Sequence, residues 1–234
     1  MSPIWQFTGL VSAALLLLSI RQLQRRSYFG PYPVLSLLLV AQLLITAAQW
    51  GQLMSIYSLT GQAYSRLYWT TEFTTEVLLT MVMISFIYRA LEGAEGRWKT
   101  LLLVALVVAA SGAVTFLTAG PPMLGGGRWP SLLARNISFG AALLNVFLWQ
   151  SLLKNRRNDI QLLLLSLGAG FWTTGRAIGQ SVRLLSKASV SAGDAIVVLT
   201  ELLTLVVWLW ALSRFKLVQP VAAPPVNAQP TTPA

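Results

Sequence analysis

The sequence contains no cysteine and no histidine, and only 10% of its 234 residues are charged. Without cysteine and histidine the chain has no thiol nucleophile, no serine–histidine pair, no Cys/His zinc site and no histidine ligand for haem. Soluble domains carry about 25% charged residues, so this chain lacks an ordinary water-exposed surface. We therefore expect no enzyme activity, no metal site and no cofactor. The low charge leads us to expect that the chain is surrounded by lipid.

Hydrophobic residues make up 55% of the chain and gather in seven long segments. Each segment has about the 20 residues that cross a bilayer as a helix: 4–21, 32–56, 66–89, 100–118, 129–153, 160–183 and 195–215. The first is not a signal peptide, because its arginines follow the apolar run. The pattern predicts an all-α integral membrane protein. Residues 1–216 would form a single bundle of seven transmembrane helices, and the uncharged, aperiodic residues 217–234 a disordered cytoplasmic tail.

The charges between these segments predict the orientation. Eleven lysines and arginines follow the first, third, fifth and seventh segments, against four in the remaining connections. The positive-inside rule places the eleven in the cytoplasm, with the N-terminus outside and the C-terminus inside. The net charge of +10 then reflects topology and contact with anionic lipid rather than nucleic acid binding. We expect a multi-pass protein of the cell inner (plasma) membrane, partnered by the lipid bilayer.

Five charged residues lie inside the predicted spans, namely Glu72, Glu76, Arg135, Arg176 and Glu201. A charge on a spanning helix costs roughly 2.5–3.5 kcal/mol, so such residues face the bundle interior and pair. At ~1.5 Å per residue, four of them lie about 10 Å below the outer edge, with Glu76 one turn deeper. We expect one charged layer in the outer half, supported by the polar or aromatic side chains of Gln49, Thr75, Trp172 and Gln180.

Two interpretations of this charged layer are open. It could be an ion-pair network that only fixes helix packing. Alternatively, it could line an outward-facing cavity in which the arginines hold an anionic group and the glutamates a cationic one. Three carboxylates face two guanidiniums, so protonation of one glutamate would balance the layer, and Glu76, the deepest, is the candidate.

Glycines in the sixth segment predict a close helix contact. Gly175 and Gly179 are four residues apart and so lie on one face of the helix. Small residues at this spacing let two backbones approach closely in a membrane. We expect the contact to lie within the chain rather than between two chains.

Three short motifs carry a family resemblance, namely the stretch Tyr68-Trp69-Thr70-Thr71-Glu72, the helix exit Ile87-Tyr88-Arg89 and Arg135. In these motifs the chain resembles an uncharacterised group of bacterial seven-helix membrane proteins. The resemblance covers most of residues 1–215 and implies the fold. The architecture is also similar to the seven-helix sensor modules of bacterial signalling proteins, although no kinase or cyclase domain follows Lys216 here.

These observations lead us to expect a receptor or sensor with an outward-facing polar cavity. It would take a small-molecule or ionic ligand from the outer side and act through a cytoplasmic signalling partner. A small transporter or proton-coupled carrier is the first alternative, ranked lower because few polar residues continue through the inner half. The second is a structural membrane subunit whose charge network only fixes helix packing.

Overall fold

A computed structural model describes residues 3–53, 61–91, 97–119, 129–155 and 159–214, and all structural statements below concern these residues. They form seven α-helices and a short 3-10 turn, η2, with no strand. The elements are α1 (Pro3–Arg25), α2 (Pro33–Leu53), α3 (Gly61–Ala90), α4 (Arg97–Ala119), α5 (Trp129–Asn155), α6 (Ile160–Leu185), η2 (Lys187–Ser189) and α7 (Val190–Arg214). The predicted disordered tail at 217–234 lies outside the described residues.

Local capping explains where α6 and α7 begin. The carboxylate of Asp159 accepts a hydrogen bond from the backbone N–H of Leu162 at 2.9 Å and so caps the start of α6. Ser186 and Ser189 cap each other reciprocally across η2, which leads directly into α7. Because this turn is so short, α7 begins at Val190 rather than at the predicted residue 195.

Five helices are long and apolar enough to cross a membrane, by length and composition of the described residues. These stretches are Phe7–Arg25, Pro33–Gly51, Arg66–Ala90, Leu132–Lys154 and Val190–Arg214. Large apolar side chains point outward along the bundle; Leu117, for example, is 82% exposed. The protein is therefore an all-helical bundle whose outer surface is compatible with lipid.

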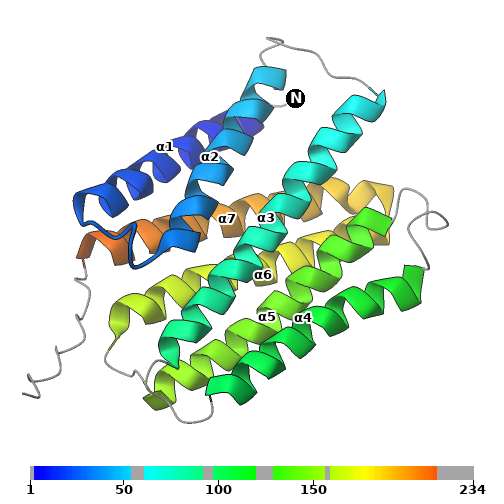
Figure 1. Ribbon diagram of the computed structural model, residues 1–234. Coiled ribbons are helices and arrows are strands. Elements are labelled where there is room, and N and C mark those ends of the chain that lie inside the picture. The colour runs from blue at the N-terminus through cyan, green and yellow to red at the C-terminus, as the bar shows by residue number, and fades with distance from the viewer. Residues whose placement is uncertain (1–2, 54–60, 92–96, 120–128, 156–158, 215–234) are drawn as a thin grey trace, which may run out of the picture.

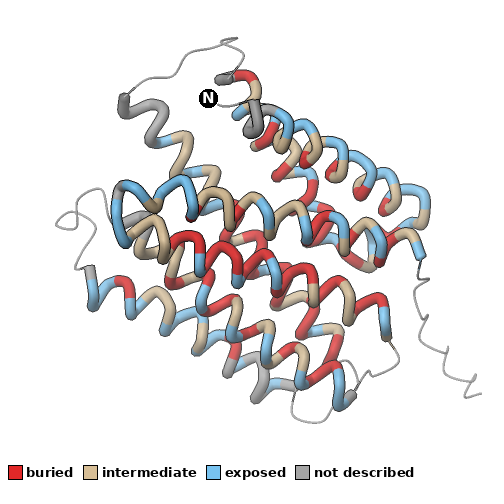
Figure 2. The backbone as a smooth tube through the Cα atoms, turned by 180° about the vertical axis from the view of Figure 1, so that it is seen from behind, coloured by how far each residue is buried: buried red, intermediate tan, exposed pale blue. Residues whose placement is uncertain are grey.

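Helix α6 lies at the centre of this bundle, in contact with α3, α5 and α7 (Figure 1). Helices α1 and α2 pack beside each other, α1 also against α7 and α2 also against α3, while α4 packs on the outside of α5. Buried residues follow the inward faces of the helices and exposed residues the outer ones (Figure 2). The order α1–α2–α3–α6–α7 closes a ring around the interior of one half of the bundle.

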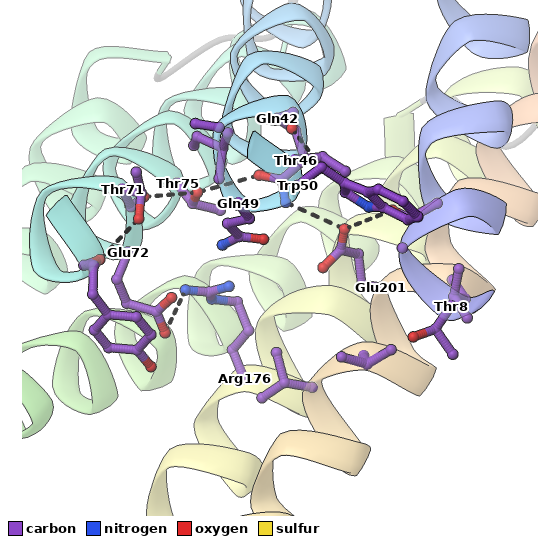
Figure 3. Close-up of a pocket in the computed structure, with 18 of the residues that line it drawn as sticks. Thr8, Gln42, Thr46, Gln49, Trp50, Thr71, Glu72, Thr75, Arg176 and Glu201 are labelled. Atoms are coloured by element: carbon purple, nitrogen blue, oxygen red, sulfur yellow. Dashed lines mark hydrogen bonds and ion pairs between the residues drawn. The ribbon is translucent and has the colours of Figure 1, made fainter. Parts of the chain in front are cut away.

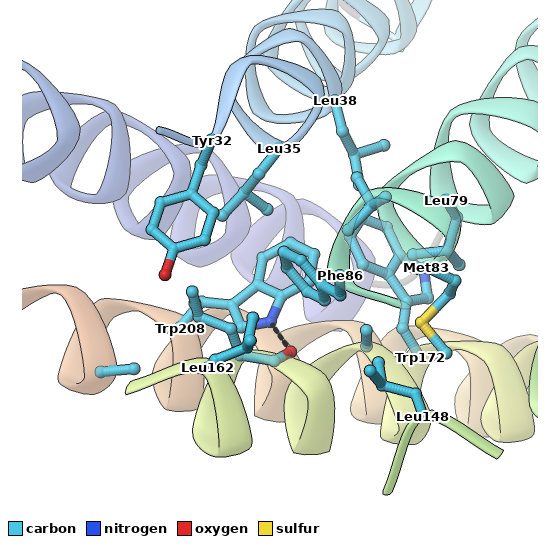
Figure 4. Packing of buried hydrophobic residues seen from close by; sticks show 14 of the residues in the cluster. Tyr32, Leu35, Leu38, Leu79, Met83, Phe86, Leu148, Leu162, Trp172 and Trp208 are labelled. Carbon is cyan, nitrogen blue, oxygen red and sulfur yellow. Dashed lines mark hydrogen bonds between the residues drawn. The ribbon is translucent and has the colours of Figure 1, made fainter. Parts of the chain in front are cut away.

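The interior towards the end of α7 is an apolar core (Figure 4). The indoles of Trp172 and Trp208 pack with ring centroids 5.6 Å apart, and Trp208 Nε1 donates to the backbone oxygen of Leu165 at 2.8 Å. At the same end, the Arg26 guanidinium donates to the backbone oxygen of Ser213. These contacts tie the α1–α2 turn and α6 to the last turns of α7.

Glycines allow α6 and α7 to approach very closely. A Cβ on Gly175 would lie 2.0 Å from the Thr200 hydroxyl oxygen, and one on Gly179 would lie 2.8 Å from the backbone oxygen of Gly193. No side chain fits in these gaps, so the small residues set the distance between the helices. The predicted close approach within the chain is confirmed.

Candidate functional site

A cavity of about 360 Å³ opens between α1, α2, α3, α6 and α7 (Figure 3). Its walls come from the beginnings of α1, α3 and α7 and the ends of α2 and α6, so it occupies the half of the bundle near the N-terminus. Small-molecule pockets begin at roughly 300 Å³. Its polar and charged lining consists of Thr8, Ser12, Gln42, Thr46, Gln49, Tyr68, Thr71, Glu72, Thr75, Arg176, Arg183 and Glu201.

Arg176 joins α6 to two carboxylates of α3 at the floor of this cavity. Its Nε lies 2.5 Å from Glu76 Oε1, and its Nη2 lies 2.9 Å from Glu72 Oε1. Glu76 also accepts a hydrogen bond from the Ser138 hydroxyl of α5 at 2.8 Å, and Glu72 accepts one from Gln180 Nε2 at 2.6 Å. Charge-assisted hydrogen bonds of this kind are the strong ones, so the cluster holds α3, α5 and α6 together.

A second arginine extends the cluster towards the end of α6. Arg183 Nη2 lies 2.6 Å from Asp194 Oδ1 of α7, and its Nη1 lies 3.6 Å from Glu72 Oε1. The same Nη1 donates to the Tyr68 hydroxyl at 3.2 Å. In the sequence, Arg183 is one of the four cations assigned to the remaining connections. Its position seven residues after Arg176, two turns along the same helix face, was the signal that it belongs to the cluster.

Glu201 of α7 is held differently, because its described partners are neutral. Its Oε1 accepts hydrogen bonds from the Ser12 hydroxyl and from Gln42 Nε2, both at 3.2 Å. The Gln42 carbonyl in turn accepts a hydrogen bond from the Thr75 hydroxyl at 3.3 Å. Within the part of the chain that the structure describes, no cation lies within ion-pair distance of Glu201. Figure 3 places it across the cavity from Glu72.

Arg135 is not part of this cluster, contrary to the predicted charged layer. Its guanidinium lies 3.4 Å from the Asn136 side-chain oxygen, and Asn136 donates to the Thr115 hydroxyl of α4 at 2.9 Å. α5 reaches the cluster through Ser138 instead. The position of a residue along its helix gives its depth. It does not give the direction in which the side chain points around the helix axis, and Arg135 points towards a different neighbour.

The four supporting residues divide between the cavity and its surroundings. Gln49 and Thr75 line the cavity, and Gln180 is buried beside it and binds Glu72. Trp172 does not line the cavity; it is fully buried against Trp208. It lies one turn before Arg176, on the side of the apolar core.

Comparison of the chain with family models, with curated proteins and with solved structures found no match.

The cluster around the cavity holds more carboxylates than guanidiniums. In the described residues, Glu72, Glu76 and Asp194 form ion pairs with two arginines, and Glu201 forms an ion pair with neither. No group of three or more acidic residues that could hold a metal ion occurs in the same residues. The cavity lining itself contains two carboxylates, Glu72 and Glu201, and two guanidiniums, Arg176 and Arg183. The arrangement therefore offers a charged, partly apolar site for a small molecule.

Proposed function

We propose that this chain is a multi-pass receptor or sensor of the inner membrane, with seven transmembrane helices and the N-terminus outside. It binds a small ligand from the outer face and acts through a cytoplasmic partner. The observation that carries the proposal is the division of the interior into two halves. A polar, charged cavity occupies the half near the N-terminus, and a closed apolar core occupies the other.

The lengths of α4 and α6 support spanning by the two helices not counted among the five long apolar ones. They contain 23 and 26 residues, so at 1.5 Å per residue each is longer than the roughly 30 Å hydrocarbon core. Because α3, α5 and α7 pack against α6, most of its polar residues are buried, among them Arg176 and Gln180. Exposed cations at the ends of α1, α5 and α7 favour a cytoplasmic position for the end opposite the cavity; they are Arg21, Arg25, Lys154 and Arg214.

The apolar core favours a receptor over a carrier. A carrier needs a site reachable from each side in turn, whereas the layer below the cavity contains fully buried large side chains, among them Met83, Phe86, Trp172 and Trp208. The same five helices that line the cavity extend to the opposite end. A ligand that binds one arrangement of these helices around the cavity more tightly than another would favour that arrangement. The opposite ends of the same helices would then change position. The Arg26–Ser213 contact lies where such a shift would be transmitted.

A structural subunit is the second candidate, and the ion pairs of Arg176 and Arg183 favour it. Buried pairs of this kind specify helix packing without any ligand. That role does not account for the cavity, nor for the carboxylate of Glu201, whose partners among the described residues are neutral.

Single-cysteine variants test for a cavity open to the outside, because the chain has no cysteine of its own. Thr46→Cys places a thiol in the cavity wall, while Leu39→Cys places one in the apolar core, seven residues earlier on the same helix face. Two small methanethiosulfonates that do not cross membranes, one cationic and one anionic, are added outside intact cells. We expect at least one to modify Thr46→Cys and neither to modify Leu39→Cys, since a buried thiol reacts only after local opening.

Failure of both reagents to reach Thr46→Cys in the folded protein, with full reaction after denaturation, would contradict an outward-facing cavity. It would favour the structural subunit. Reaction only in inverted membrane vesicles would instead show that the orientation is wrong.

A further inference from the structure

We propose that the ligand of this cavity carries a protonated amine and that Glu201 binds it. This inference rests on the proposed function, since it names the ligand class for the same cavity. The ion pairs around the cavity leave one of its lining carboxylates, Glu201, without a cation at ion-pair distance among the described residues.

The two arginines of the cavity are already balanced by carboxylates. Arg176 lies between Glu72 and Glu76, at 2.9 and 2.5 Å, and Arg183 lies 2.6 Å from Asp194. An anionic ligand would have to compete with these ion pairs inside a site of low dielectric, where like charges repel strongly. Glu201 is the lining carboxylate that these ion pairs do not use, and it favours a cation.

Glu201 is the carboxylate with room for that cation. Both of its described hydrogen bonds, from Ser12 and Gln42, go to Oε1. In Figure 3, the other oxygen points away from those two donors, towards the side of the cavity on which Arg176 lies. The Ser12 and Gln42 donors are bound to Oε1, so Oε2 of Glu201 can accept hydrogen bonds from a ligand. An ammonium group has three N–H donors and no acceptor, and therefore complements this oxygen.

The neighbouring walls suit an organic cation rather than a bare metal ion. Trp50 also lines the cavity (Figure 3), and its indole packs against Gly9, where a Cβ would lie 2.6 Å from Nε1. A tryptophan face attracts cations. Aliphatic side chains of Ile45, Val198 and Leu202 complete this wall and can contact an apolar body. A metal ion would need further oxygen ligands, and the described residues contain no group of three or more acidic side chains that could hold one.

The test measures how three probes of similar size protect Thr46→Cys from modification in the purified protein. The probes are n-butylammonium, butyrate and n-butanol, at matched ionic strength. We expect n-butylammonium to slow the modification several-fold, and butyrate and butanol to leave the rate unchanged, because only the first carries a positive charge to Glu201.

Three second-site variants identify the carboxylate responsible. Glu201→Gln removes the charge at nearly constant shape and is expected to abolish protection, whereas Glu201→Asp keeps the charge and retains part of it. Asp159→Asn is the matched control, since it removes one carboxylate at the N-cap of α6, away from the cavity lining, and asparagine still caps a helix. It should leave protection intact.

A further measurement leaves Glu201 unchanged, so that its result does not depend on whether the Glu201 variants fold. The ratio of the cationic to the anionic reagent's rate at Thr46→Cys should exceed the same ratio for free cysteine several-fold. A ratio at or below that of free cysteine would overturn the amine assignment. So would protection by butyrate but not by n-butylammonium, or equal protection in Glu201→Gln. In each of these cases Thr46→Cys is still labelled, so the proposed outward-facing cavity would stand.

Discussion

Arg176→Met is expected to lower the free energy of unfolding by about 3–5 kcal/mol, the range for a buried ion pair that loses one partner. The guanidinium side chain is only 4% exposed, and it lies against both Glu72 and Glu76. Without it, Glu76, which is fully buried, keeps only the Ser138 hydroxyl as a described partner. Glu72 keeps Gln180 and Arg183. Most of the loss should therefore arise at Glu76.

Arg135→Met is the matched control for this variant, because both arginines lie inside predicted spans. Since the only hydrogen bonds of the Arg135 guanidinium to described residues go to the neighbouring Asn136, we expect a change within about 0.5 kcal/mol. Unfolding of the purified variants in mixed micelles, followed by tryptophan fluorescence, gives both values. Equal losses for the two variants would show that the ion-pair cluster does not hold the bundle together.

A double variant separates the lost ion pair from lost packing. Glu76→Gln in the Arg176→Met background removes the carboxylate that would otherwise remain buried without a countercharge. Residues in direct contact are not additive, so the double variant should be more stable than Arg176→Met alone. If it is less stable, the loss in the single variant comes from packing of the arginine side chain.

Gly179→Ala is expected to destabilise the protein by about 1–3 kcal/mol, the usual range for overpacking a core. Its new Cβ would lie 2.5 Å from Val197 Cγ2 and 2.8 Å from the backbone oxygen of Gly193. The side chain of Val197 can rotate, but a backbone oxygen moves only with its helix. The substitution therefore forces α6 and α7 apart beside the cavity.

Gly112→Ala provides the control for Gly179→Ala, since nothing lies within 4 Å of a Cβ at that position of α4. There the added methyl group should stabilise the helix by roughly 0.5–1 kcal/mol, because alanine loses less backbone entropy than glycine. The two glycine variants should thus shift the unfolding midpoint in opposite directions. Shifts of the same sign would mean that the α6–α7 contact is looser than the structure shows.

Much of the helical architecture was predictable from the sequence, because a hydrophobic segment of bilayer length is a local property. A chain in lipid must satisfy its backbone hydrogen bonds within each such segment, and a helix does so. The approach of α6 to α7 through Gly175 and Gly179 was likewise predictable, since the spacing of four residues places both on one face. The seven-span orientation with the N-terminus outside rests on loop charges and stays a prediction.

The membership of the charged cluster was only partly predictable. Rise per residue predicts the same depth for Glu72 and Arg176, with Glu76 one turn deeper, and the structure brings all three together. The same estimate of depth predicted that Arg135 belongs to the cluster. It did not include Arg183, because that residue lies near a helix end. Depth follows from position along one helix, whereas partners depend on its rotation against its neighbours.

Taken alone, the sequence determined which segments are helical and roughly where each lies along the chain, because both depend on one segment at a time. The tertiary structure alone decided that α6 lies at the centre, that Arg183 joins the cluster while Arg135 turns towards Asn136, and that Glu201 faces a cavity with neutral partners. The physical reason is that most of these helices are apolar on nearly every side. Such a helix carries no amphipathic pattern to show which face turns inward, so only packing between helices sets that face.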